Sequence, residues 1–127
     1  MMAYKYWNPN NRKLDNRGDC VVRAISKVMN QSWDKTYWEL CGQGYLMGDF
    51  GNANAVWDSY LRGCGFVRRV IPNYCPDCYT VRDFCHDHDV GTYILAIGNH
   101  TIASIDGSYF DSWDSGDLVP IFYYERR

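Results

Sequence analysis

The dipeptide Asp106-Gly107 is the feature that most constrains the fold, because it separates two segments in which apolar and polar residues alternate. Such a dipeptide favours a two-residue hairpin turn that admits positive φ, and a two-residue turn fixes the pairing of both strands. With Ile105 opposite Ser108, His100 and Asp111 become diagonal neighbours on one face, about 7–8 Å apart at Cα. A slip of one residue would place Asp111 on the wrong face.

Helical periodicity comes before strand alternation along the chain. Helical patterns predict one helix at 19–30, a second that begins at about Ser32 and a third at 53–64. An edge strand is expected next, at 66–71. A Thr80–Asp83 capping box then opens a short helix. Four strands then follow at 92–97, 100–105, 108–113 and 118–124. This order predicts an α+β fold with N-terminal helices packed on one face of a C-terminal, mostly antiparallel meander.

The length of 127 residues suits one domain, residues 1–127, in which the polar segment 1–18 forms an irregular N-terminal arm. Lysine and arginine number 13 against 15 acidic residues, so the chain lacks the broad basic surface of a nucleic-acid-binding protein. We therefore expect no nucleic acid as a partner. No sequence pattern indicates an oligomeric state.

The first residues lack the apolar stretch of a signal peptide, and no later run is long enough to cross a bilayer. A cytoplasmic protein without a membrane partner is the expectation. In a reducing compartment the six cysteines are expected to be thiols that are catalytic, metal-bound or buried.

Cys20 lies where a polar loop, Asn16-Arg17-Gly18-Asp19, becomes an apolar helical pattern. A thiol at a helix start meets the positive end of the helix dipole, which lowers its pKa and favours the nucleophilic thiolate. A single cysteine is by itself more often a core residue. The polar neighbours of Cys20, and a helical stripe that runs through Val21 and Ile25 without it, favour a nucleophile.

His100 and Asp111 supply the two other side chains that a cysteine nucleophile needs. The imidazole takes the thiol proton and later protonates the leaving group, while a carboxylate fixes the tautomer of the ring. Trp113, on the same face of the predicted hairpin, is placed to shield the His–Asp hydrogen bond from water. Considered alone, each residue has a simpler interpretation: His100 is a turn residue, and Asp111 is a surface charge on a strand.

Cys20 at a helix start, His100 at a strand start and the triplet Asp111-Ser112-Trp113 together resemble the papain-like cysteine peptidases. In that superfamily the third residue is an Asn within Asn-Ser-Trp, and here an Asp replaces it. Asp19-Cys20 and the surroundings of His100 are similar to the small bacteriocin-processing-type branch and to compact phage and bacterial relatives. The resemblance implies a papain-like fold for the α+β domain. It also implies a Cys-His-Asp hydrolase or acyl transferase without a cofactor, acting on an amide or thioester carbonyl of a peptide or protein substrate.

One position departs from the pattern of that superfamily. Its members usually carry a Gln six residues before the nucleophile as an oxyanion-hole donor, and this chain has Leu14 there. Asn16 is the nearest side-chain amide, and the backbone N–H of Cys20 is the second expected donor. The departure keeps a different function open, namely a catalytically degenerate papain-like scaffold that binds a protein partner as a phage-encoded or bacterial accessory factor.

A second constellation could hold a metal ion. Cys75, Cys78, Cys85 and His88, with His86 as an alternative ligand, offer the soft and borderline donors that tetrahedral zinc prefers. A zinc-stabilised interaction module is thus a third possibility. Core or surface thiols are the default interpretation, because Cys85 and His88 share the apolar face of a short helix.

Overall fold

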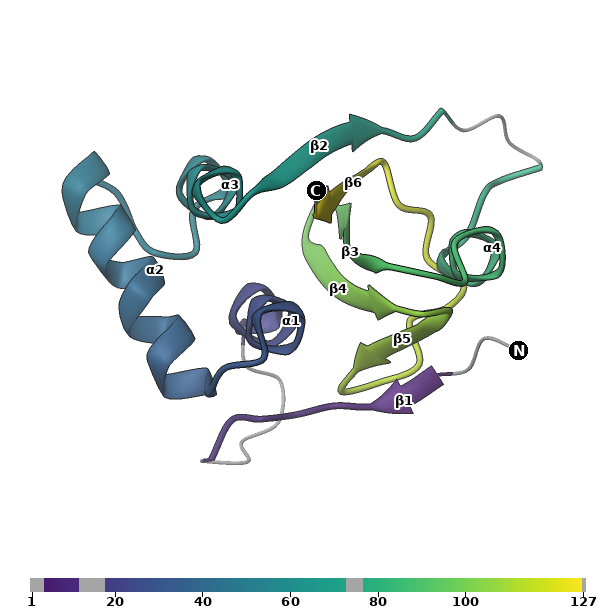
Figure 1. The fold of residues 1–127 in the computed structure, drawn as a ribbon, viewed down its shortest axis with the longest axis horizontal. Helices are drawn as coiled ribbons and strands as arrows, with labels where there is room; N and C mark the ends of the chain where they lie inside the picture. Colours follow the sequence, from purple (N-terminus) through teal and green to yellow (C-terminus); the bar gives the residue numbers. More distant parts are fainter. Residues whose placement is uncertain (1–3, 12–17, 73–76, 127) are drawn as a thin grey trace.

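A mixed β-sheet with helices on both faces forms the computed structural model, which describes residues 4–11, 18–72 and 77–126 (Figure 1). The described elements are β1 (Tyr4–Tyr6), α1 (Cys20–Met29), α2 (Trp33–Met47), α3 (Asn54–Gly63), β2 (Phe66–Val70), α4 (Val81–Asp87), β3 (Thr92–Ile97), β4 (His100–Ile105), β5 (Ser108–Asp111) and β6 (Phe122–Arg126). The expected α+β class is confirmed, although strand β1 precedes the helices and β2 precedes α4.

Local capping chemistry sets several of the helix ends. The Ser32 hydroxyl accepts a hydrogen bond from the Lys35 N–H and opens α2, and Thr80 with Asp83 forms the predicted capping box of α4. Helix α1 ends at Asn30, which adopts the left-handed conformation with φ of 53°. Asp19 occupies the N-cap position of α1, but its side chain makes no capping hydrogen bond.

The strands follow the order β1-β5-β4-β3-β6-β2. All neighbouring strands are antiparallel except β1 and β5, which run parallel. The last strand therefore does not continue a meander beside β5; it returns to the far side of β3. The N-terminal arm was expected to be irregular, and it instead contributes β1, because Tyr4–Tyr6 pairs with Tyr109–Asp111.

The hairpin that joins β4 and β5 has the predicted register. Ile105 pairs with Ser108 and Ala103 with Phe110. Asp106 and Gly107 form the turn, with φ values of 49° and 83°. Both lie in the left-handed region, which glycine and aspartate tolerate better than most residues.

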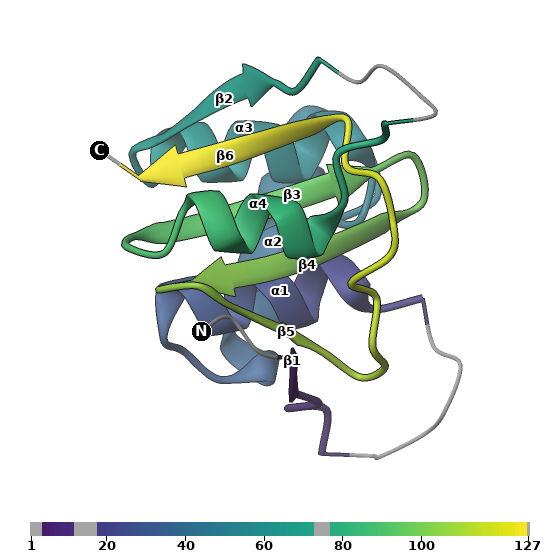
Figure 2. The ribbon, with the colours of Figure 1, turned by 90° about the vertical axis from the view of Figure 1, so that its right-hand side faces the viewer.

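Two hydrophobic clusters fill the spaces on the two faces of the sheet. The larger joins α1, α2 and α3 to one face and includes Ile25, Leu40 and Leu61. The smaller joins α4 to the opposite face through Val81 and Phe84. Figure 2 shows α4 in front of the sheet and the other three helices behind it. The prediction that all helices cover one face was wrong for α4, because the apolar stripe of α4 packs on the second apolar face of the central strands.

Within the described ranges, none of the helices has the length and apolarity that crossing a membrane would require.

Candidate functional site

The three residues predicted to form a triad come together at one end of the sheet. Cys20 is the first residue of α1, His100 is the first residue of β4 and Asp111 is the last residue of β5. Cys20 is half-buried, and its thiol and the His100 side chain interact closely enough for each to shift the pKa of the other. Helix α1 packs directly against β4, which brings the two residues to each other.

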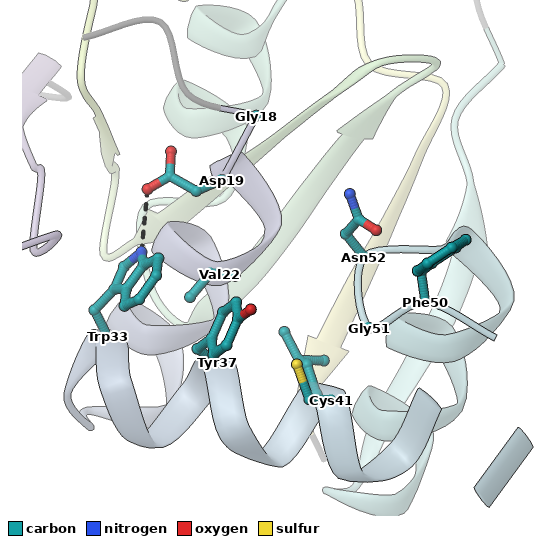
Figure 3. A pocket seen from close by; sticks show the side chains of 10 residues that line it. Gly18, Asp19, Val22, Trp33, Tyr37, Cys41, Phe50, Gly51 and Asn52 are labelled. Carbon is teal, nitrogen blue, oxygen red and sulfur yellow. Dashed lines mark hydrogen bonds between the residues drawn. The ribbon is translucent and has the colours of Figure 1, made fainter. Parts of the chain in front are cut away.

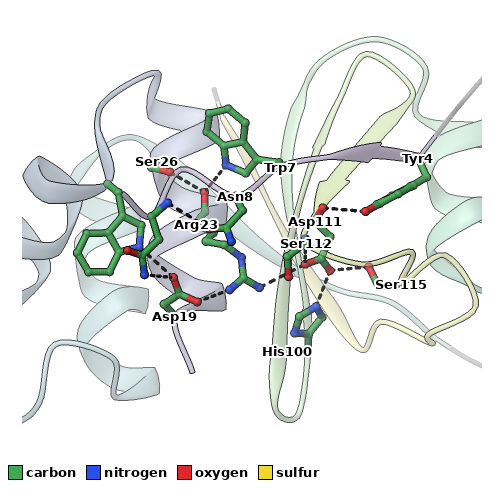
Figure 4. Close-up of polar contacts among 12 residues, drawn as sticks. Tyr4, Trp7, Asn8, Asp19, Arg23, Ser26, His100, Asp111, Ser112 and Ser115 are labelled. Carbon is green, nitrogen blue, oxygen red and sulfur yellow. Dashed lines mark hydrogen bonds and ion pairs between the residues drawn. The ribbon is translucent and has the colours of Figure 1, made fainter. Parts of the chain in front are cut away.

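His100 bridges the thiol and the carboxylate. Its Nε2 lies 2.6 Å from Asp111 Oδ2, with 12% of the His100 side chain and 1% of the Asp111 side chain exposed (Figure 4). Since Asp111 engages Nε2, Nδ1 is the ring nitrogen that remains for Cys20. This arrangement holds the imidazole between a nucleophile and an orienting carboxylate.

The electrostatics of the site favour a thiolate beside an imidazolium. Burial raises the pKa of Cys20, but the hydrogen bond and charge of His100, together with the Thr101 backbone N–H and Arg23, lower it below its ordinary value. Burial lowers the pKa of His100, yet the hydrogen bonds and charges of Asp111 and Cys20 outweigh burial and raise that pKa to about 9. A neutral solution therefore favours the charged imidazolium of His100, and the lowered pKa gives Cys20 a larger thiolate fraction than an ordinary thiol has.

Asp111 is the most heavily constrained residue of the site. Its side chain accepts hydrogen bonds from the Ser112 N–H and the Ser115 hydroxyl, each at 2.7 Å. Its backbone carbonyl accepts from the Tyr4 hydroxyl at 3.1 Å and from the Trp7 N–H at 2.8 Å, so the N-terminal strand also holds it. Burial raises the pKa of Asp111, but the hydrogen bonds from His100 and Ser115, the charge of His100 and the Ser112 N–H lower it below its ordinary value.

Arg23 links this carboxylate to helix α1. It donates to Asp111 Oδ1 at 3.3 Å and also forms an ion pair with Asp19, whose other oxygen accepts from Asn10 and from the Trp33 indole at 3.2 and 3.1 Å (Figure 4). The sequence analysis did not identify Arg23. The i, i+4 spacing of Asp19 and Arg23 was a visible signal for their pairing, but the contact with Asp111 spans 88 residues and leaves no local pattern.

Trp113 lies where the sequence placed it, over the imidazole. The ring centroids of Trp113 and His100 are 5.2 Å apart, and Trp113 is 48% exposed. The ring therefore covers one side of His100 while remaining open to solvent on the other.

The thiol and the imidazole border a cavity of about 200 Å³. Its lining comprises Gly18, Cys20, Val21, Asn52, Asn54, Trp57, Ile97, Gly98, Asn99, His100 and Thr101. We call this the thiol cavity. It has space for a reacting group to reach the sulfur.

Asn16, the predicted side-chain donor of the oxyanion hole, and Leu14, which replaces the Gln of the superfamily, both lie outside the described residues. Among the described residues, the backbone N–H of Cys20 is at the first position of α1, where helical N–H groups have no partner within the helix. Asn52 and Asn54 carry amides that line the thiol cavity, and the Asn54 carbonyl oxygen accepts from the Trp57 indole at 3.1 Å.

The described members of the predicted zinc set do not form a metal site. Cys75 lies outside the described residues, and Cys78 is disulfide-bonded, so the expectation that every cysteine is a thiol was wrong for Cys78. The buried Cys85 sulfur is 3.3 Å from the Ser104 hydroxyl, and the His88 ring stacks on Phe84 at 3.8 Å. No cluster of three or more His, Cys, Asp or Glu side chains in the described part of the chain could hold a metal ion, and this includes His86.

Comparison of the chain with protein-family models, with curated proteins and with solved structures gave no match in any of the three.

Proposed function

We propose that the protein is a cysteine hydrolase or acyl transferase of papain-like type, which attacks an amide or thioester carbonyl of a peptide or protein. The observation that carries the proposal is the chain of contacts from the Cys20 thiol through His100 to Asp111, in which Nε2 and Oδ2 are 2.6 Å apart. The lowered pKa of Cys20 and the raised pKa of His100 support the same assignment.

In the proposed reaction the Cys20 thiolate attacks the carbonyl carbon and forms a C–S bond. The charge that develops on the carbonyl oxygen is stabilised by the Cys20 backbone N–H at the start of α1. His100 donates its proton to the leaving amine or thiolate as the bond to the carbonyl carbon breaks, which leaves a thioester on Cys20.

The second half of the reaction restores the enzyme. Neutral His100 takes a proton from water, the resulting hydroxide attacks the thioester, and the C–S bond breaks to give a carboxylic acid and the Cys20 thiolate. An acceptor amine in place of water gives acyl transfer. Asp111 keeps the imidazole in the orientation that both proton transfers need, and it stays ionised throughout.

Peptide-library cleavage tests this function. The wild-type protein and Cys20→Ala are incubated with a proteome-derived peptide library, and new termini are counted by mass spectrometry. We expect new termini with the wild-type protein that are lost with Cys20→Ala and kept with Cys64→Ala, a second half-buried thiol that lies outside the triad and outside the lining of the thiol cavity.

The alternative function, a scaffold that binds a protein partner without catalysis, is favoured by Leu14 at the position where papain-like peptidases carry Gln. It predicts no cleavage by either protein. It also predicts that Cys20→Ala retains the biological effect of the wild-type chain.

A further inference from the structure

A second cavity, of about 280 Å³, adjoins the thiol cavity and shares Gly18 and Asn52 with it (Figure 3). We call it the α2 cavity, because helix α2 forms one wall and the start of α1 and the loop at 48–53 form the others. Its lining comprises Gly18, Asp19, Val22, Trp33, Tyr37, Leu40, Cys41, Phe50, Gly51 and Asn52. The two shared residues make the α2 cavity and the thiol cavity neighbours.

The walls of the α2 cavity are mainly apolar. Val22 and Leu40 are buried, with exposed fractions of 7% and 2%, while Phe50 is 80% exposed. Trp33 and Tyr37 stack with centroids 5.2 Å apart and planes within 11° of each other. The exposed phenyl ring at one end of the cavity and the stacked aromatic rings at the other both gain from covering by another apolar group.

The one charged side chain of this lining is already neutralised. Asp19 accepts from the Trp33 indole and forms an ion pair with the buried Arg23. Its carboxylate therefore offers no free charge to a cationic ligand, and the cavity selects for an uncharged group.

Two glycines bring the loop into close contact with helix α2. A Cβ on Gly51 would lie 3.1 Å from backbone atoms of Leu40 and Cys41, and one on Gly44 would lie 2.6 Å from the Asp49 carbonyl oxygen. Both approaches require the absence of a side chain. The wall that carries Phe50 is thus built against α2, which makes the cavity part of the folded structure.

We propose that the α2 cavity binds one large apolar side chain, aromatic or branched aliphatic, of the peptide whose carbonyl Cys20 attacks. This inference rests on the proposed function and assigns its substrate preference. The size agrees, because a cavity of about 280 Å³ has room for a single large side chain. Tyr37 and Phe50 are the specificity-determining residues.

Electrophiles that differ only in their tail test the proposal. Alkylation rates of Cys20 are measured by peptide mapping with iodoacetamide, with N-(2-hydroxyethyl)iodoacetamide and with phenylalkyl iodoacetamides carrying one to four methylenes. In the wild-type protein the best phenylalkyl reagent should react about tenfold faster than the hydroxyethyl reagent, as expected for an apolar group in a fitting pocket.

In the variants Tyr37→Ala and Phe50→Ala, the ratio of the phenylalkyl rate to the hydroxyethyl rate should fall close to one. The rate with iodoacetamide itself should stay unchanged. Tyr45→Ala is the matched control, because Tyr45 is 85% exposed on the same helix and lies outside the cavity lining. A ratio that is equal in the wild-type protein and in both variants would overturn the proposal. Slow reaction of Cys20 with iodoacetamide itself would count instead against the proposed function.

A binding measurement tests whether the α2 cavity is occupied, independently of any reaction at Cys20. In Cys20→Ser, the methyl NMR signals of Val22 and Leu40 should shift on addition of N-acetyl-Ala-Phe-Ala-amide and stay in place with N-acetyl-Ala-Ser-Ala-amide. The absence of a shift with the phenylalanine peptide would also overturn the proposal, whatever the reactivity of Cys20.

Discussion

Arg23 and Asp111 form an ion pair between two buried side chains, with Arg23 Nη2 3.3 Å from Asp111 Oδ1 and only 9% and 1% of the two side chains exposed. Helix α1 therefore supplies the thiol at its first residue and, one turn later, the cation that holds the carboxylate behind His100. A single rigid element thus relates the nucleophile to the residue that orients its base.

Arg23→Ala should lower the free energy of unfolding by about 3–5 kcal/mol, because it leaves Asp19 and Asp111 without their cation in a buried site. Urea unfolding at pH 7 measures this change. The matched control is Arg62→Ala, which removes an exposed i, i+4 ion pair with Asp58, and its cost should be about 0.3–0.5 kcal/mol. Similar losses of unfolding free energy in both variants would contradict the role of Arg23 in holding Asp111.

Asp111→Asn should lower the pKa of His100 from its value of about 9, because the hydrogen bond and charge of Asp111 raise that pKa while burial lowers it. An opposite charge at this distance shifts a pKa by about 1–3. NMR titration of the His100 ring measures the change. Asp114→Asn, at a carboxylate with 46% side-chain exposure near the site, should leave the pKa of His100 where it is.

The pH dependence of stability follows from the raised pKa of His100. A folded-state pKa above the ordinary value contributes stability that is complete below about 6.5 and is lost as the pH rises through the folded-state pKa. The lowered pKa of Cys20 acts in the opposite direction, so Cys20→Ser leaves the part of the histidine contribution that Asp111 supplies. The unfolding free energy of Cys20→Ser should decrease above pH 6.5 more steeply than that of Cys20→Ser/His100→Gln, and parallel curves would contradict the pairing of His100 with Asp111.

Gly107→Ala should destabilise the β4–β5 hairpin. Gly107 has φ of 83°, and a side chain in the left-handed region costs about 1–2 kcal/mol. Gly63→Ala is the control, because Gly63 ends α3 with open space where the methyl group would lie. Thermal unfolding should show a loss for Gly107→Ala and none for Gly63→Ala.

The parts of the fold that the sequence predicted correctly are those with local causes. The Asp106-Gly107 turn set the register that brings His100 to Asp111, and the Thr80–Asp83 capping box fixed the start of α4. Each of these signals lies within a few residues of the structure that it determines. The contact between His100 and Asp111 could be predicted because one tight hairpin contains both.

The parts that were missed depend on contacts between distant segments. Strand β1 has three residues, too few to show a period, and it forms only because β5 offers a free edge more than 100 residues later. The contact of Arg23 with Asp111 likewise requires α1 to pack on the end of β5. The position of α4 depends on the second apolar face of the central strands, which alternation alone does not assign to a partner.

The most direct test of the central claim is the pH profile of Cys20 alkylation by iodoacetamide, followed site by site by mass spectrometry in the folded protein. We predict that Cys20 reacts faster than Cys41 and Cys64 below pH 8, with a midpoint below the ordinary thiol pKa of about 8.5. His100→Gln should move that midpoint upward, because the variant loses the charge of His100, which lowers the pKa of Cys20, while burial continues to raise that pKa. Equal rates at the three cysteines, or a midpoint that His100→Gln leaves unchanged, would contradict a thiolate–imidazolium pair at this site.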